Sequence, residues 1–192
     1  MAHPDANRWN ERYSTEVDFW TELQPSQLLK KYSHLLPIRG VALDAACGMG
    51  RNGLYLAKRG LRVISLDISE TALSRLVQRF EKEGFEPAAA IYDLSNPWFP
   101  DEYFDIIINF RFLDRNTFPV YRSSLKPGGI LFFETFLKQN NDAHPSANYL
   151  ESGELLDEFQ QFQVILWDEK LITKVGEQTQ KWIAQLVARK PD

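Results

Sequence analysis

Three aspartates are the side chains of this sequence best suited to binding chemistry. Asp44, Asp67 and Asp93 each close a short apolar run that the pattern predicts to be a buried strand. The carboxyl ends of parallel strands meet at one edge of a sheet, and ligands of open α/β sheets bind there. We therefore expect the three carboxylates to form one negatively charged crevice, which suits a cationic ligand.

A glycine-rich turn follows the first of these strands. Residues 48–53, Gly-Met-Gly-Arg-Asn-Gly, fit the dinucleotide-binding pattern G-x-G-x-x-G and lead into a helical pattern. The glycines permit a tight turn and close approach of a ligand, and the helix start offers unpaired N–H groups. Asp44, four residues before Gly48, would repel a pyrophosphate. A ligand with positive charge and no phosphate, such as S-adenosylmethionine, fits this loop better.

Asp67 is spaced to bind a ribose. It lies 19 residues after Gly48, where an acid at the end of the second strand accepts hydrogen bonds from both hydroxyls of an adenosine ribose. This feature serves NAD and S-adenosylmethionine equally. A solvated acid at the strand end is the alternative interpretation.

Residues 43–50, Leu-Asp-Ala-Ala-Cys-Gly-Met-Gly, resemble the first motif of class I S-adenosylmethionine-dependent methyltransferases, which usually runs acid-x-Gly-x-Gly-x-Gly. Ala46 stands where the first glycine is usual, so we expect a backbone there that does not need a positive φ. Residues 50–57 also resemble the tellurite-resistance-type branch of that superfamily. The superfamily resemblance extends over nearly the whole chain.

The resemblance implies a site for the cofactor S-adenosylmethionine. It places Asp93 and Leu94 at the adenine, with a simple turn before Ser95 as the alternative. It places the aromatic-rich residues 9–13 over the cofactor, with a helix packed on the sheet edge as the alternative. The expected cofactor-binding residues are Trp9, Arg12, Tyr13, Asp44, Ala46, Gly48, Gly50, Arg51, Asn52, Asp67, Ile68, Asp93, Leu94, Asn109 and Phe110.

The side of the site that would hold a methyl acceptor is marked less clearly. Residues 109–112 end the most apolar predicted strand, where a transferred methyl group would meet its acceptor. Arg111 and Arg115 could hold an anionic substrate there, or could be surface arginines. A thiolate or a chalcogen oxyanion needs no general base, whereas a hydroxyl or an ammonium needs one. The candidate catalytic residues are Arg111, Glu134, His144 and Tyr149.

The element pattern predicts an α/β fold in a single domain over residues 1–192. Residues 1–40 form a helical cap, and residues 41–192 form a Rossmann-like core. The core should hold a seven-stranded, mostly parallel sheet with an antiparallel C-terminal strand and helices on both faces. Predicted helices cover residues 6–13, 24–36, 51–58, 70–83, 117–125 and 154–159, and predicted strands after the first cover 62–67, 88–93, 103–110, 130–136, 164–169 and 181–189.

Composition limits the partners and the compartment. The 192 residues carry a net charge of −4 and no Lys/Arg-rich run, which argues against nucleic acid or an anionic membrane as a partner. Cys47 is the only cysteine, which fits a reducing compartment, and we interpret it as a packing residue and not as a nucleophile. The polar N-terminus and the lack of a membrane-length apolar run predict a cytoplasmic protein. No metal-ligand spacing is present, and the oligomeric state stays open.

The sequence thus predicts an S-adenosylmethionine-dependent methyltransferase that acts on a small-molecule acceptor, possibly a thiol or a chalcogen oxyanion. The Asn-Pro-Pro-aromatic motif of several amide and amine N-methyltransferases is absent, which argues against those substrates. Two alternatives remain open. One is a protein that binds S-adenosylmethionine without catalysis, and the other is an NAD(P)-dependent oxidoreductase.

Overall fold

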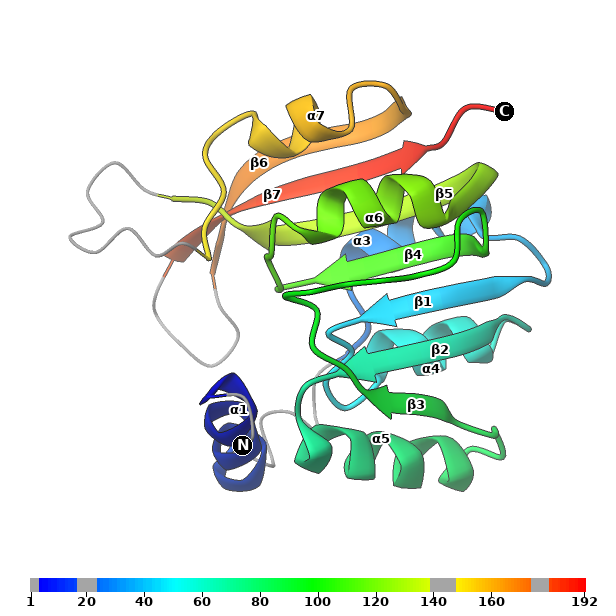
Figure 1. Cartoon of the computed structure of the whole chain (residues 1–192), viewed down its shortest axis with the longest axis vertical. Coiled ribbons are helices and arrows are strands. Elements are labelled where there is room, and N and C mark those ends of the chain that lie inside the picture. The colour runs from blue at the N-terminus through cyan, green and yellow to red at the C-terminus, as the bar shows by residue number, and fades with distance from the viewer. Residues whose placement is uncertain (1–3, 17–23, 139–147, 174–179) are drawn as a thin grey trace.

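The computed structural model describes residues 4–16, 24–138, 148–173 and 180–192, and a seven-stranded sheet organises them (Figure 1). The strand order is β3-β2-β1-β4-β5-β7-β6. Strand β7 pairs antiparallel with both neighbours, and the other described pairs are parallel. The strands are β1 (Val41–Ala45), β2 (Arg62–Asp67), β3 (Ala88–Ile91), β4 (Phe104–Phe110), β5 (Leu125–Phe136), β6 (Gln163–Thr173) and β7 (Gln180–Arg189). The predicted seven-stranded, mostly parallel sheet with an antiparallel C-terminal strand is confirmed.

Helices cover both faces of this sheet, as predicted. Side chains alternate along a strand, so Ala42 and Leu43 of β1 belong to two different apolar cores. Helices α3, α4 and α5 contribute to the core that contains Ala42, and α6 and α7 contribute to the core that contains Leu43. The helical elements are α1 (Pro4–Thr15), α3 (Gln27–Lys31), the 3-10 helix η1 (Ser33–Leu35), α4 (Arg51–Ala57), α5 (Glu70–Lys82), α6 (Thr117–Ser124) and α7 (Glu154–Glu158).

Some predicted elements have different bounds. The helix predicted over residues 24–36 is replaced by α3 and η1, because Ser26 caps α3 and donates its backbone N–H to Asn52 Oδ1 at 2.9 Å. Strand β3 ends at Ile91, so Asp93 lies beyond it and accepts a hydrogen bond from the Ser95 N–H in a local turn. Strand β5 begins at Leu125, five residues earlier than predicted, because Leu125 already pairs with Phe104. Residues 126–129 then interrupt the pairing with β4, and Gly128 has a φ of +72°, so the chain does turn where a tight turn was expected.

Helix α1 is attached to the start of α5 through one side chain. Asn10 Oδ1 accepts hydrogen bonds from Ser69 Oγ at 2.7 Å and from the Thr71 N–H at 3.1 Å. These donors lie at the N-terminus of α5, where backbone N–H groups have no partner within the helix. Figure 1 shows α1 beside the carboxyl ends of β1, β2 and β3 as a result.

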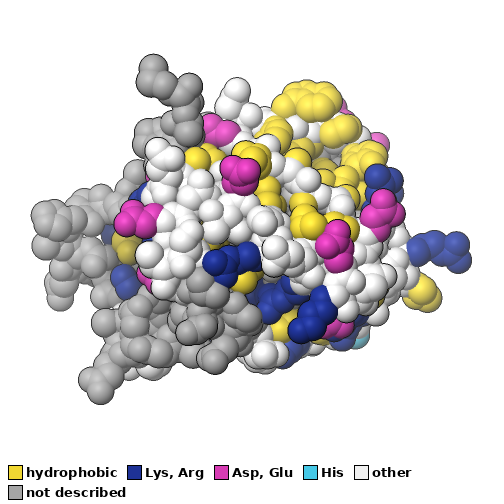
Figure 2. All heavy atoms as spheres, turned by 90° about the horizontal axis from the view of Figure 1, so that it is seen from below, with side chains coloured by type: hydrophobic (Ala, Val, Ile, Leu, Met, Phe, Trp, Pro, Cys, Tyr) yellow, Lys and Arg dark blue, Asp and Glu magenta, His cyan; other side chains and the backbone are white. Residues whose placement is uncertain are grey.

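The edge of the sheet carries exposed apolar side chains. Ile91 at the end of β3 is 59% exposed, and Trp98 in the following segment is 74% exposed. Figure 2 shows hydrophobic side chains gathered on one part of the face seen from below, apart from a group of Lys and Arg side chains. Among the residues that the structure describes, no helix has the length and apolar character needed to cross a membrane.

Candidate functional site

A cavity of about 440 Å³ lies at the carboxyl ends of the central strands, between the sheet and α1. This is the end of an open α/β sheet where ligands bind. Twelve of the residues predicted for the cofactor line it, namely Trp9, Arg12, Tyr13, Ala46, Gly48, Arg51, Asn52, Asp67, Ile68, Asp93, Leu94 and Phe110. Of the predicted catalytic candidates, Arg111 and Tyr149 line it, Glu134 lies outside its lining, and His144 falls outside the described residues.

Asp67 lies at the end of β2 with its carboxylate fixed by the backbone. Oδ2 accepts the Gly48 N–H at 2.8 Å, and Oδ1 accepts the Ser69 N–H at 2.9 Å. Burial raises the pKa of Asp67, and the backbone hydrogen bonds lower it in part. The Ile68 N–H also lowers the pKa of Asp67. Because a carboxylate has about four acceptor positions, these backbone donors do not saturate it, and Asp67 can still accept from a ligand in the cavity.

Gly48 leaves space for the Tyr13 hydroxyl, which any side chain at position 48 would occupy. Its φ is +54°, and a Cβ at this position would lie 2.5 Å from Tyr13 Oη. Tyr13 comes from α1, is buried, and has its pKa raised chiefly by that burial, so its hydroxyl stays protonated. The loop after β1 and helix α1 therefore approach each other closely only because residue 48 is glycine.

The position of Asp44 corrects one expectation. Its side chain is 2% exposed, does not line the cavity, and accepts the Gly53 N–H at 2.8 Å. Gly53 is in the first turn of α4, where the N–H groups have no partner within the helix, so Asp44 caps α4 from β1. Burial raises its pKa to about 7. Asp44 thus shapes the glycine loop from behind and does not face a ligand.

The prediction for the Ala46 backbone is wrong. Ala46 has a φ of +52°, in the left-handed region that costs a non-glycine residue about 1 to 2 kcal/mol. The turn is imposed because the next N–H, of Cys47, pairs with the Leu66 carbonyl at 3.0 Å and keeps the chain against β2. Positive φ at a non-glycine residue clusters at functional sites, and Ala46 lines the cavity.

Two other predicted cofactor residues serve the loops and do not line the cavity. A Cβ on Gly50 would lie 2.6 Å from Leu76 Cγ, so this glycine lets α4 start against α5. Asn109 is fully buried, donates Nδ2 to the Phe112 carbonyl at 2.8 Å, and accepts from Tyr121 Oη at 3.1 Å. It therefore fixes the course of the chain after β4.

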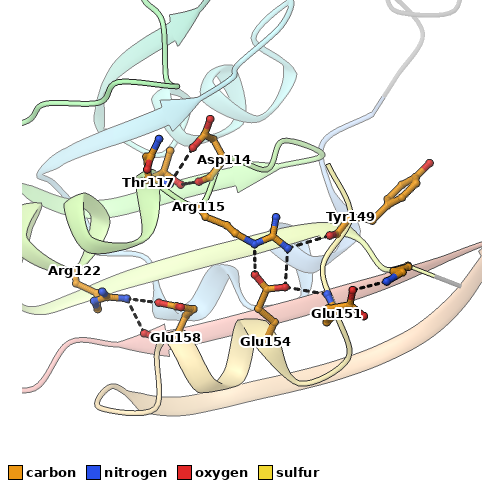
Figure 3. A network of polar contacts seen from close by, with 10 residues as sticks. Asp114, Arg115, Thr117, Arg122, Tyr149, Glu151, Glu154 and Glu158 are labelled. Atoms are coloured by element: carbon orange, nitrogen blue, oxygen red, sulfur yellow. Dashed lines mark hydrogen bonds and ion pairs between the residues drawn. The ribbon is translucent and has the colours of Figure 1, made fainter. Parts of the chain in front are cut away.

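The two arginines after β4 have different roles. Arg115 pairs with Glu154 through Nε and Nη2 at 2.5 and 2.8 Å, and donates to the Tyr149 carbonyl at 3.2 Å (Figure 3). It does not line the cavity. Arg115 is therefore a surface arginine and not a substrate ligand. It attaches the segment containing Tyr149 to the chain after β4. Arg111, by contrast, does line the cavity.

The prediction that the crevice is negatively charged is also wrong, because its lining carries charges of both signs. The lining contains the aspartates Asp5, Asp67, Asp93 and Asp114 and the arginines Arg8, Arg12, Arg51 and Arg111. Burial lowers the pKa of Arg51, and the positive charge of Arg111 lowers it further. The cavity therefore suits a ligand, or a pair of ligands, with charges of both signs.

Comparison with known proteins agrees with this geometry. The methyltransferase domain family matches residues 42–129. A probable S-adenosyl-L-methionine-dependent methyltransferase TehB of Haemophilus influenzae is 36% identical over 87 residues, which cover 44% of this chain and 30% of that protein. A probable thiol methyltransferase 2 of Arabidopsis thaliana is 26% identical over 146 residues, 68% of this chain and 62% of that protein.

The crystal structure of TehB from Haemophilus influenzae superimposes with a TM-score of 0.77 at 22% identity, and covers 95% of this chain and 67% of that one. This chain has the Rossmann-like fold of that methyltransferase structure, and its residues 42–129 match the methyltransferase domain family. The match to the curated TehB proteins spans less than a third of their length.

Sequence reasoning did not predict part of the cavity lining. The additional lining residues are Asp5, Arg8, Cys47, Met49, Tyr92, Ser95, Phe112, Leu113, Asp114, Phe136 and Asn148. Most carry no local pattern, because tertiary packing alone brings α1 and the segments after β3, β4 and β5 together. Cys47 lines the cavity with its thiol pKa raised by burial, so the thiol stays protonated, in agreement with the interpretation that it is not a nucleophile.

Proposed function

We propose that this protein binds S-adenosylmethionine in the cavity and transfers its methyl group to a small acceptor. The observation that carries the proposal is Asp67, a buried carboxylate at the end of β2 that is fixed by backbone N–H groups, lines the cavity and is not saturated with donors. Neighbouring ribose hydroxyls are donors that suit such a carboxylate, in charge-assisted hydrogen bonds. The match to the methyltransferase domain family supports this cofactor.

Other lining residues fit the same ligand. Leu94 offers an apolar surface for an adenine ring, and Asp93 lies beside it in the lining. Gly48 has no Cβ, so the backbone can approach the ligand while Tyr13 packs against it. The ligand would supply a methyl group already activated by a sulfonium, so the protein has to position the two reactants, and orientation alone can lower a barrier by several kcal/mol.

The acceptor side favours a nucleophile that needs no general base. Of the candidates for a base, Glu134 lies outside the lining and is paired with Arg111, and Tyr149 is the one that lines the cavity. The thiol of Cys47 stays protonated, because burial raises its pKa. The lining after β4 and β5 combines the aromatic rings of Phe110, Phe112 and Phe136 with the cation of Arg111. We therefore propose a thiol or a chalcogen oxyanion as the acceptor class, as the similarity to a probable thiol methyltransferase also favours. The acceptor's lone pair forms the new bond to the methyl carbon while the carbon–sulfonium bond breaks.

Calorimetry with S-adenosylmethionine, S-adenosylhomocysteine and NAD tests the cofactor. We expect binding of the first two, and Asp67→Asn should weaken it by about 10- to 100-fold, the scale of a hydrogen bond to a charged group. Asp101→Asn, at an exposed acid in the turn before β4, is the matched control and should bind as the wild type does. Tight NAD binding without S-adenosylmethionine binding would instead support an oxidoreductase.

Turnover separates an enzyme from a protein that only binds the cofactor. The protein is incubated with methyl-labelled S-adenosylmethionine and a panel of small thiols, amines and oxyanions, and labelled product is measured. Product from thiols or oxyanions, and none from amines, is the expected result. Cofactor binding with no labelled product from any acceptor would favour the non-catalytic alternative.

A further inference from the structure

Arg111 has an unusual backbone at the point where β4 opens into the cavity. Its φ is +67°, in the region that L side chains rarely adopt. Its N–H still donates to the Glu134 carbonyl at 2.7 Å and so continues the pairing of β4 with β5. The chain therefore turns within a single residue, and the Arg111 side chain becomes part of the cavity lining.

Two groups hold the guanidinium of Arg111 in place, and a third supports one of them. Nη2 forms an ion pair with Glu134 Oε1 at 3.0 Å, and the guanidinium carbon lies 4.8 Å from the ring centre of Phe136. Glu134 is itself buried, and its other carboxylate oxygen accepts a hydrogen bond from Gln185 Nε2. Glu134 and Gln185 face each other in the register of β5 and β7. An arginine held on two sides in this way loses little freedom when it binds a further group.

One nitrogen of this guanidinium has no hydrogen-bond acceptor among the described residues. This nitrogen is Nη1 of Arg111, and it is buried. A buried donor on a charged group is costly to leave unpaired. Arg51, a second largely buried cation, lines the same cavity and donates Nη1 to the Gln24 carbonyl at 2.9 Å. An anion bound in the cavity would satisfy the donor and reduce the repulsion between the two arginines.

We propose that Arg111 recognises the methyl acceptor by its negative charge, with Nη1 donating to an oxygen anion of the acceptor, and that Glu134 and Gln185 are positioning residues for this guanidinium. This inference rests on the proposed function, because it assigns the anion to the acceptor. It names the acceptor class as a small nucleophile that carries a carboxylate or is itself an oxyanion. Arg111 thus makes the enzyme select an anionic acceptor over a neutral one of the same size.

Two thiols of similar size test the selection. Mercaptoacetate carries a carboxylate and 2-mercaptoethanol carries a hydroxyl, and selenite provides an oxyanion without a separate carboxylate. For the wild type we expect a higher kcat/KM with mercaptoacetate than with 2-mercaptoethanol. Arg111→Gln should lower kcat/KM for mercaptoacetate by about 10- to 100-fold and leave 2-mercaptoethanol within about threefold. Arg62→Gln, at an exposed arginine at the start of β2, is the matched control and should change neither value.

A second variant guards against misfolding, because Arg111→Gln leaves Glu134 buried without its cation. The double variant Arg111→Gln/Glu134→Gln removes both charges and should show the same loss of selection. Glu134→Gln alone should raise the KM for mercaptoacetate while kcat and the KM for 2-mercaptoethanol stay unchanged. A purely structural role of Glu134 would shift both thiols equally, and that result would remove it as a positioning residue.

Affinity for S-adenosylhomocysteine separates this inference from the proposed function. If the wild type does not bind S-adenosylhomocysteine, the proposed function fails. If the wild type binds it and Arg111→Gln weakens that binding more than tenfold, Arg111 holds the cofactor and the inference is wrong. If neither thiol nor selenite is turned over, calorimetry with mercaptoacetate and the S-adenosylhomocysteine complex replaces turnover. Binding that depends on Arg111 then supports the inference, and no binding overturns it.

Discussion

Asp44 offers a direct test of how the glycine loop is held. Its carboxyl is 2% exposed, and the Gly53 N–H is its hydrogen-bond donor at 2.8 Å. Burial, only partly offset by that hydrogen bond and by Arg51, raises the pKa from the ordinary 3.8 to about 7. The folded protein thus holds a proton on Asp44 more tightly than the unfolded chain does.

The sign of the pH dependence follows from this shift. The folded state binds more protons than the unfolded state between the two pKa values, so the free energy of unfolding falls as the pH rises through this range. The shift of about 3 pKa units corresponds to about 4 kcal/mol in total, at 1.36 kcal/mol for each unit. About 2 to 3 kcal/mol of this loss falls between about pH 5 and about pH 8, and above pH 8 the contribution is constant.

The substitution Asp44→Asn isolates this effect. Asparagine keeps an oxygen for the Gly53 N–H and cannot ionise. Urea unfolding should show that the variant gains about 2 to 3 kcal/mol relative to the wild type between about pH 5 and about pH 8. Asp101→Asn, at an exposed acid, should stay within about 0.5 kcal/mol of the wild type at both pH values. A difference between Asp44→Asn and the wild type that does not change with pH would refute the reasoning.

Three further substitutions test how the cavity is built. Gly48→Ala would place a Cβ 2.5 Å from Tyr13 Oη and should weaken S-adenosylhomocysteine binding, measured by calorimetry, by at least about tenfold. Gly84→Ala is the control, because Gly84 also has a positive φ, of +80°, but has no neighbour within 4 Å, and it should leave the affinity unchanged. Asn10→Ala should release α1 from α5, seen as faster hydrogen exchange in α1 and an affinity about fivefold lower. Arg115→Met should raise the KM for the acceptor without changing the affinity for the cofactor, because the carbonyl of Tyr149 loses its donor. Equal losses of affinity for the acceptor and the cofactor would contradict this prediction.

The sequence was sufficient where local pattern determines structure. The strand ending at Asp67 and the helix capped by Ser69 have the predicted positions, because alternating apolar residues and a capping side chain act over a few residues. The seven-stranded, mostly parallel sheet with its antiparallel C-terminal strand followed from the same elements and from the superfamily resemblance. Leu94 and Asp93 also line the cavity as expected, although β3 ends before them.

The sequence failed where function depends on contacts across the sheet. Asp44 lies one residue before the end of β1, whereas Asp67 ends β2. The Asp44 side chain belongs to the face covered by α4 and accepts the Gly53 N–H instead of lining the cavity. The pairing of Glu134 with Gln185 joins positions 51 residues apart, and it depends on the antiparallel register of β5 and β7. No local pattern encodes either contact.

The two sides of the cavity are therefore built by different means. The side proposed for the cofactor uses backbone groups and strand ends, such as the Gly48 N–H and the carboxylate of Asp67, which follow from the strand–turn–helix order itself. The side proposed for the acceptor uses side chains held by tertiary pairs, such as Arg111 on Glu134 and Arg115 on Glu154. Changing one such pair alters what the acceptor side can hold without disturbing the backbone that binds the cofactor. Acceptor specificity should thus be altered by substitutions on β5, β7 and α7, while cofactor affinity should depend on β1, β2 and α1.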